Sequence, residues 1–109
     1  RRMAVKSVLP GQKALIMHPN DNVAVAIRDI EAGEEVELAM PDREQPLRIQ
    51  VRQPIAFGHK FALEDIPAGA PVRKYGEQMG VATAPIGRGE HVHVHNVEST
   101  RARGDKYTA

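Results

Sequence analysis

The stretch Ala26-Ile27-Arg28-Asp29-Ile30-Glu31-Ala32-Gly33-Glu34-Glu35-Val36 recurs as Ala62-Leu63-Glu64-Asp65-Ile66-Pro67-Ala68-Gly69-Ala70-Pro71-Val72. A degenerate third copy reads Thr83-Ala84-Pro85-Ile86-Gly87-Arg88-Gly89-Glu90-His91-Val92. Each copy combines a strand end, an isoleucine, a short connection, a glycine and the start of the next strand. The glycine supplies the positive φ that such a reversal often needs. The copies are spaced too irregularly for a solenoid, so they predict three turns within one β domain.

Short strand signals fill the chain between these turns. No window sustains an apolar stripe at helical spacing over three turns, and eight Pro and nine Gly interrupt the sequence. Helices are therefore expected to be single turns at most, over 53–58 and 75–79. The pattern predicts an all-β class, as a small barrel or clip-like fold. The expected strands span 14–18, 23–29, 36–40, 47–52, 60–64, 72–75, 81–84 and 90–96.

Composition indicates one domain, or one piece of a larger protein, in the cytoplasm. The chain has 109 residues, no cysteine, and 15 Lys+Arg against 14 Asp+Glu. Without cysteine, a metal site would use nitrogen and oxygen ligands only. Interspersed charges and few aromatic residues predict that the chain has no nucleic-acid partner. The chain contains no apolar segment of the kind that forms a signal peptide or a membrane span, so neither is expected. We expect an N-terminal extension over 1–12, the β domain over 13–97 and a polar tail or linker over 98–109.

The last expected strand, Glu90-His91-Val92-His93-Val94-His95-Asn96, holds three of the five histidines. Alternation along a strand places His91, His93 and His95 on one face and the two valines on the other, as an anchor. Neighbours at i and i+2 lie about 6.6–6.8 Å apart, which lets two imidazoles bind one ion through bonds of about 2.0–2.1 Å. The prediction is a site on His91 with His93, or on His93 with His95, completed by other ligands. A solvated polar strand face is the alternative.

A second motif, His18-Pro19-Asn20-Asp21-Asn22, follows the expected strand over 14–18. Asn and Asp side chains build turns by bonding to nearby backbone, so a capped β-turn is the favoured interpretation. The alternative makes His18 and Asp21 ligands of a metal or a substrate at a loop rim.

Two glycine-containing motifs supply the remaining candidates. In Gly58-His59-Lys60 the glycine would let the backbone approach a ligand, while the histidine and lysine bind a carboxylate or transfer protons. In Arg73-Lys74-Tyr75-Gly76-Glu77-Gln78-Met79-Gly80, Lys74 with Tyr75 can bind an anion at a turn. The alternative for both motifs is an ordinary strand end, because lysines often serve to keep strand edges soluble.

In combination these motifs resemble the N-terminal domain of the altronate/galactarate dehydratase family. The resemblance covers about residues 13 to 98, and the order of several motifs makes it more specific than any one of them. The family's domain is of SAF type and has a β-clip fold. The matching segments are His18-x-x-Asp21-Asn22-Val23-Ala24-Val25-Ala26, Gly58-His59-Lys60-Phe61-Ala62, Asp65-Ile66, Lys74-Tyr75-Gly76, Gly80 and Gly89-Glu90-His91-Val92-His93-Val94-His95-Asn96.

The resemblance, closest to the altronate-type branch, implies metal-assisted dehydration of a sugar acid. It also implies a large dehydratase domain or subunit as partner, without which this chain is expected to be inactive. A divalent cation, Fe²⁺ or Mn²⁺, suits imidazole and oxygen ligands. The candidate metal ligands are His18, His91, His93 and His95; the candidates for proton transfer are His59 and Lys60, with His59 also a possible third ligand; the candidates for substrate binding are Asp21, Asn22, Lys74 and Tyr75.

Two other functions are compatible with the same residues. Relatives with separate small and large subunits include sulfolactate sulfo-lyases, so the chain can be the small subunit of such an enzyme. SAF-type domains also occur in proteins that handle carbohydrates. A non-catalytic module that binds a sugar acid or assists assembly is therefore the third interpretation.

Overall fold

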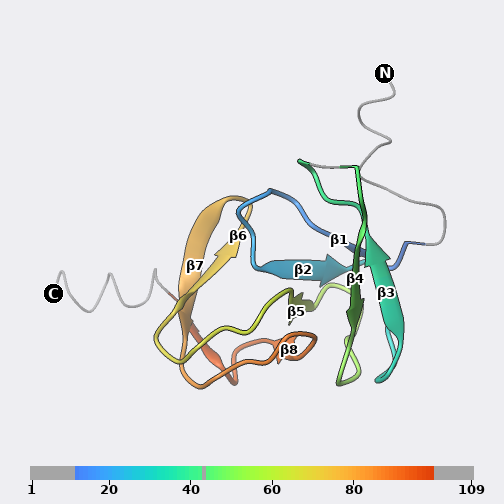
Figure 1. Cartoon of the computed structure of the whole chain (residues 1–109). Helices are drawn as coiled ribbons and strands as arrows, with labels where there is room; N and C mark the ends of the chain where they lie inside the picture. The colour runs from blue at the N-terminus through green and yellow to red at the C-terminus, as the bar shows by residue number, and fades with distance from the viewer. Residues whose placement is uncertain (1–11, 43, 100–109) are drawn as a thin grey trace, which may run out of the picture.

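The computed structural model describes residues 12–42 and 44–99, which form nine short strands and no helix (Figure 1). The predicted all-β class is confirmed. In Figure 1 the β3–β4 hairpin lies on one side of a central sheet and β6 with β7 on the other. The central sheet has the strand order β1 (Ala14–Leu15), β2 (Val23–Ala26), β5 (Lys60–Ala62) and β8 (His91–Val92). The second sheet is formed by β3 (Glu35–Leu38) and β4 (Leu47–Gln50). The third sheet has the strand order β6 (Pro71–Lys74), β7 (Glu77–Ala82) and β9 (Val97–Ser99).

The repeated turns are present, and they pair with one another. Ile66 and Ile86 exchange two backbone hydrogen bonds of 2.7 and 2.8 Å. Ile30 pairs with Ile55 in the same way, through two bonds of 2.8 Å. Ile55 therefore belongs to a fourth copy, which the sequence pattern did not reveal. The single-turn helix predicted over 53–58 is wrong, because the amide and carbonyl of Ile55 are engaged by the partner turn.

The same hydrogen bonds hold both pairs of turns. Asp29 accepts from the backbone N–H of Phe57 at 2.9 Å, and Asp65 accepts from that of Arg88 at 2.9 Å. In all four copies a glycine with φ between 84° and 90° follows the isoleucine by three residues: Gly33, Gly58, Gly69 and Gly89. The domain is thus built from two similar pairs of turns.

Hydrophobic residues fill both faces of the central sheet. Successive residues of β2 and β5 point to opposite faces, so Ala24 and Phe61 enter one cluster while Val23 and Ala62 enter the other. Burial on both faces explains why β2 reads as the uninterrupted apolar run Val-Ala-Val-Ala. Among the described residues no helix is long and apolar enough to cross a membrane.

The hairpin between β6 and β7 replaces the single-turn helix predicted over 75–79. Lys74 pairs with Glu77 across a two-residue turn. Tyr75 and Gly76 in this turn both have positive φ, of 58° and 78°. Such a pair matches the hairpin turns whose twist suits antiparallel strands, although Asn or Gly is the usual first residue.

The histidine-rich strand predicted over 90–96 ends after Val92 and a turn follows. Asn96 closes this turn, since its side chain accepts from the N–H of His93 at 2.9 Å and donates to the carbonyl of His91 at 2.8 Å. Val94 was predicted to anchor the strand; instead it is 81% exposed.

The predicted domain boundaries are only partly within the described residues. Glu98 and Ser99 were expected in the polar tail, but they belong to β9, which pairs with β7. Gln12, expected in the N-terminal extension, is buried. The remaining residues of the expected extension and tail, 1–11 and 100–109, lie outside the described part of the chain.

Candidate functional site

Pairing between β5 and β8 gathers three histidines. Phe61 lies opposite His91 in this antiparallel pair, and extending the register by one more pair places His59 opposite His93. Residues in such cross-strand positions have Cβ atoms about 4.5–5.5 Å apart. The side chain of Gln53 also accepts from the backbone N–H of His91 at 2.8 Å, which ties β8 to the fourth turn.

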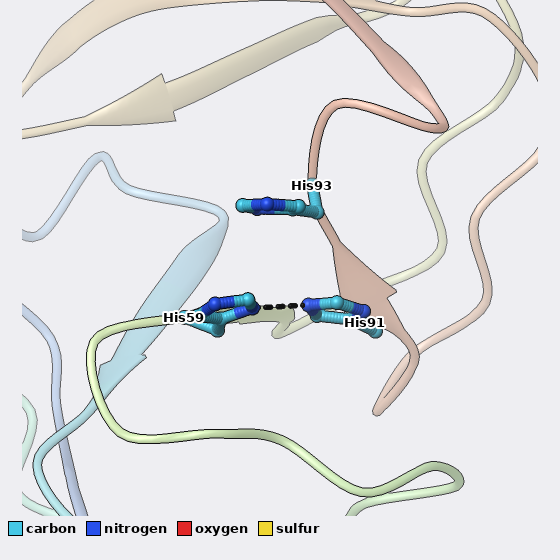
Figure 2. A group of neighbouring side chains, drawn as sticks. All are labelled: His59, His91 and His93. Atoms are coloured by element: carbon cyan, nitrogen blue, oxygen red, sulfur yellow. Dashed lines mark hydrogen bonds between the residues drawn. The ribbon is translucent and has the colours of Figure 1, made fainter.

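The three rings of His59, His91 and His93, here called the histidine group, lie nearly parallel (Figure 2). His59 and His93 stack with ring centroids 4.3 Å apart, and the centroids of His91 and His93 are 5.3 Å apart. Nδ1 of His59 lies 2.8 Å from Nε2 of His91, a hydrogen bond between two imidazoles. One nitrogen donates and the other accepts, so at least one of these two rings is neutral.

His59 occupies a position that carries a turn-capping residue in two other copies of the repeat. Glu34 and Glu90 stand at this position, and each accepts a hydrogen bond from a backbone N–H of its own turn, at 2.8 and 2.7 Å respectively. In the fourth copy the side chain is an imidazole that contacts His91 instead. Aligning the sequence on Ile55 and Gly58 would have revealed this exchange.

Desolvation lowers the pKa of two members of the histidine group. Partial desolvation lowers the pKa of His91, and the neighbouring charge of His59 lowers it further. Desolvation followed by the charge of His59 also lowers the pKa of His93. Neutral imidazoles have the free lone pairs that metal ligands require.

The histidine group is a candidate metal site. One ring nitrogen from each of the three residues lies within 4.8 Å of the others, and all three side chains are half-buried. Nitrogens that share one tetrahedral ion through bonds of about 2.1 Å lie roughly 3.4 Å apart, so the three side chains would move closer together on binding an ion. No other His, Asp or Glu side chains within 12–42 and 44–99 form a group of three at this spacing.

The two other histidines predicted as metal ligands lie outside the histidine group. The ring of His95 is tilted by 37° to that of His91, with centroids 5.3 Å apart. Nδ1 of His18 accepts from the backbone N–H of Asn20 at 3.1 Å, and its ring lies against Gly76, where a Cβ would come within 2.9 Å of it. For both residues a role as metal ligand stays a prediction.

Asp21, a candidate for substrate binding, holds the β6–β7 turn. Its carboxylate accepts from the backbone N–H groups of Tyr75 at 3.0 Å and Gly76 at 2.7 Å. The residue is only 8% exposed. Charge-assisted bonds of this kind are about twice as strong as neutral ones, which explains how Tyr75 is held at a positive φ.

Asn22 attaches β6 to the start of β2. Its side chain donates to the carbonyl of Pro71 at 2.9 Å and accepts from the N–H of Arg73 at 2.8 Å, and the residue is 2% exposed. The favoured turn interpretation is correct in that the N–H of Asp21 donates to the carbonyl of His18 at 3.0 Å. The side chains, however, bond to a distant hairpin rather than to nearby backbone. Asp21 and Asn22 together form what we call the clamp; their role as substrate ligands stays a prediction.

The lysine candidates lie beside these two clusters. Lys60 follows His59 directly, and strand alternation directs the two side chains to opposite faces of the sheet. The charge of Lys60 nevertheless contributes to lowering the pKa of His91 and of His93, so the ammonium group lies near the histidine group. Burial lowers the pKa of Lys60, and the charge of Lys74 adds to the shift. Nζ of Lys74 lies 4.8 Å from the centroid of the Tyr75 ring, a cation–π contact.

Comparison with known proteins identifies the domain. Residues 12–100 match the family described as altronate/galactarate dehydratase SAF domain. The chain therefore belongs to this family, as its motif order predicts. It is 45% identical over 91 residues to altronate dehydratase of Escherichia coli and 39% identical over 83 residues to that of Bacillus subtilis. These alignments cover 84% and 76% of the chain but only 17% and 16% of the two relatives.

A further relative is itself a short chain. The alpha subunit of (2R)-sulfolactate sulfo-lyase from Chromohalobacter salexigens is 34% identical over 88 residues, which cover 79% of this chain and 94% of the subunit. The domain thus occurs both as a small part of long dehydratases and as almost the whole of a lyase subunit.

Proposed function

We propose that this chain is the SAF domain of a hydro-lyase that dehydrates a sugar acid, of the altronate dehydratase type. The histidine group would hold a divalent ion, Fe²⁺ or Mn²⁺, at one wall of the active site. The observation that carries the proposal is the convergence of three imidazoles from two paired strands, in a chain 45% identical to an altronate dehydratase. The cytoplasm is the predicted compartment.

The residues of the site suit elimination of water. A divalent ion, when bound, would polarise the departing hydroxyl and stabilise developing negative charge. The rings of His59, His91 and His93 offer the nitrogen ligands. Lys60 is suited to transfer a proton or to bind the carboxylate, since its lowered pKa brings the amine closer to the neutral range.

A larger domain or subunit would complete the site. The chain spans only 17% of the E. coli altronate dehydratase, and its histidine group is half-buried rather than enclosed. We therefore expect the isolated chain to show no dehydratase activity. Dehydration of a sugar acid by this chain alone would contradict the shared site.

A chimera tests the proposal directly. Residues 12–100 of this chain would replace the matching segment of the E. coli altronate dehydratase, and dehydration of altronate would be measured with Fe²⁺ or Mn²⁺. We expect an active chimera that loses at least tenfold in kcat/KM on His59→Gln or His93→Gln, whereas the exposed substitution Arg48→Gln leaves the rate unchanged. A folded, active chimera that tolerates both histidine substitutions would refute the proposed role of the histidine group.

A second candidate function is the small subunit of a sulfolactate sulfo-lyase. The specific observation in its favour is that the chain covers 94% of the alpha subunit of the C. salexigens enzyme. The test replaces that alpha subunit by this chain in the otherwise complete enzyme and measures cleavage of sulfolactate. Restored cleavage, together with an inactive altronate dehydratase chimera, would establish this alternative.

A non-catalytic module is the third candidate, and it makes no use of a metal. Titration of the chain with Mn²⁺ or Zn²⁺, followed through the imidazole NMR signals, separates it from the first two. Perturbation of the histidine group at sub-millimolar metal supports the enzymatic proposals, and its absence favours a binding or assembly role.

A further inference from the structure

Two half-buried lysines lack an acidic partner within the described residues. The ion pairs found in residues 12–42 and 44–99 are Lys13 with Glu34 and Arg48 with Glu37. Lys60 and Lys74 take part in neither. The carboxylate of Asp21, which lies at the same hairpin as Lys74, is engaged by two backbone N–H groups. Their positive charge is therefore not neutralised by an ion pair within this part of the domain.

The fold directs Lys60 toward the strand that carries Lys74. Lys60 pairs with Val25 and Val92 across the central sheet, so it points to the same face as Val92. On that face Val92 packs in one cluster with Val72 of β6. Asn22 fixes β6 to the start of β2, and Lys74 is the last residue of β6. The electrostatic effect of Lys74 on Lys60 agrees with this placement.

The hairpin turn keeps an aromatic ring under Lys74. Tyr75 is 58% exposed and has a φ of 58°, a conformation that costs a non-glycine residue about 1–2 kcal/mol. Asn or Gly would fill this turn position with less strain. The clamp and the ring of His18 against Gly76 hold the turn in place. Strain maintained in this way at an exposed residue is typical of functional positions, and here it supports the ammonium of Lys74.

We propose that Lys60 and Lys74 form a subsite for the carboxylate of a hydroxy acid, with the Tyr75 ring positioning Lys74. A bound carboxylate would neutralise two ammonium groups that otherwise repel each other, and half-burial strengthens such pairing relative to water. The naming of a sugar acid as the ligand depends on the proposed function, but carboxylate binding at this subsite needs neither metal nor the histidine group.

NMR on the metal-free chain at low salt tests the subsite. Altronate is titrated while the Cε–Hε signals of the lysines are followed. We expect saturable shifts at Lys60 and Lys74 with millimolar affinity, and no shift at Lys13, which is paired with Glu34. The sugar alcohol of the same carbon number, which lacks the carboxylate, should produce none of these shifts. Lys60→Gln or Lys74→Gln should each weaken altronate binding about tenfold, whereas Lys13→Gln should not.

Tyr75→Asn tests the role of the aromatic ring in binding while it preserves the turn. Asn is a favoured residue for this turn, so the variant should unfold at the same temperature or higher while it binds altronate more weakly. Wild-type affinity in this variant would overturn the role of Tyr75. The absence of saturable shifts at Lys60 and Lys74 at tens of millimolar altronate, or equal shifts with the alcohol, would overturn the subsite itself.

This experiment can fail independently of the proposed function. If the lysines bind altronate but the dehydratase chimera is inactive, the subsite holds and the hydro-lyase proposal fails. If the chimera is active but the lysines do not respond, the histidine group and the hydro-lyase proposal stand without this subsite.

Discussion

The clamp and the histidine group use polar side chains in opposite ways. In the clamp, Asp21 and Asn22 are almost fully buried, and their side chains are hydrogen-bonded to the backbone of the β6–β7 hairpin. In the histidine group the rings are half-buried, and the side-chain hydrogen bond of His59 is made to another imidazole, His91. Polar groups that serve the scaffold are thus bonded to backbone, whereas groups available to a ligand contact one another.

Removal of the clamp carboxylate should have the largest effect on stability. Asp21→Ala leaves the N–H groups of Tyr75 and Gly76 without their acceptor and releases a strained turn, so we expect a loss of about 3 kcal/mol in the free energy of unfolding. Urea denaturation measures it. Asp65→Ala is the matched control, because the structure records a single exposed bond to a backbone N–H for Asp65; its loss should be about 1 kcal/mol. Equal losses in the two variants would contradict the special role of the clamp.

Loss of a ligand from the histidine group should act on metal affinity and leave stability nearly unchanged. His59→Gln or His93→Gln removes one of the three proposed nitrogen ligands, so we expect the affinity for Mn²⁺ to fall about 100-fold, a change near 2.8 kcal/mol. Isothermal titration calorimetry measures the Mn²⁺ affinity. Asp21→Asn is the control, because it should lower the stability of the fold and leave the Mn²⁺ affinity unchanged. Unaltered affinity after either histidine substitution would refute the metal site.

Acid should destabilise the metal-free chain through His91. The pKa of His91 is lowered from an ordinary value of 6.5, chiefly by burial, so the unfolded chain takes up the proton first as the pH falls. This contribution to stability is complete above about pH 7 and declines below about 6.5, down to the lowered pKa. Thermal unfolding as a function of pH measures it. His91→Gln should flatten the profile in this window, and a wild-type profile no steeper than that of the variant would contradict the assigned shift.

The smallest effects are expected at the two histidines outside the histidine group. His95 lies beside His91 in a tilted arrangement, and His18 contacts the hairpin turn. We expect His95→Gln and His18→Gln each to change Mn²⁺ affinity less than about threefold, because neither belongs to the three converging nitrogens. A loss of Mn²⁺ affinity as large as that caused by His93→Gln would show that the substituted histidine is a metal ligand.

Local pattern predicted the turns, the all-β class and the candidate histidines, because isoleucine–glycine spacing and strand alternation are short-range features. The fourth turn escaped prediction because it shares only its isoleucine and glycine with the first two copies, although Ile55 pairs with Ile30. The early end of β8 depends on the side chain of Asn96. The clamp joins Asp21 to residues more than fifty positions away. These last features follow from tertiary contacts that periodicity does not encode.

Anomalous diffraction from crystals of the chain grown with Mn²⁺ tests the central claim most directly. The account predicts one anomalous peak at the manganese edge, within bonding distance of ring nitrogens of His59, His91 and His93, with the His59–His91 hydrogen bond replaced by bonds to the ion. A fully occupied peak at His18 or at acidic side chains, with that hydrogen bond intact, would contradict it.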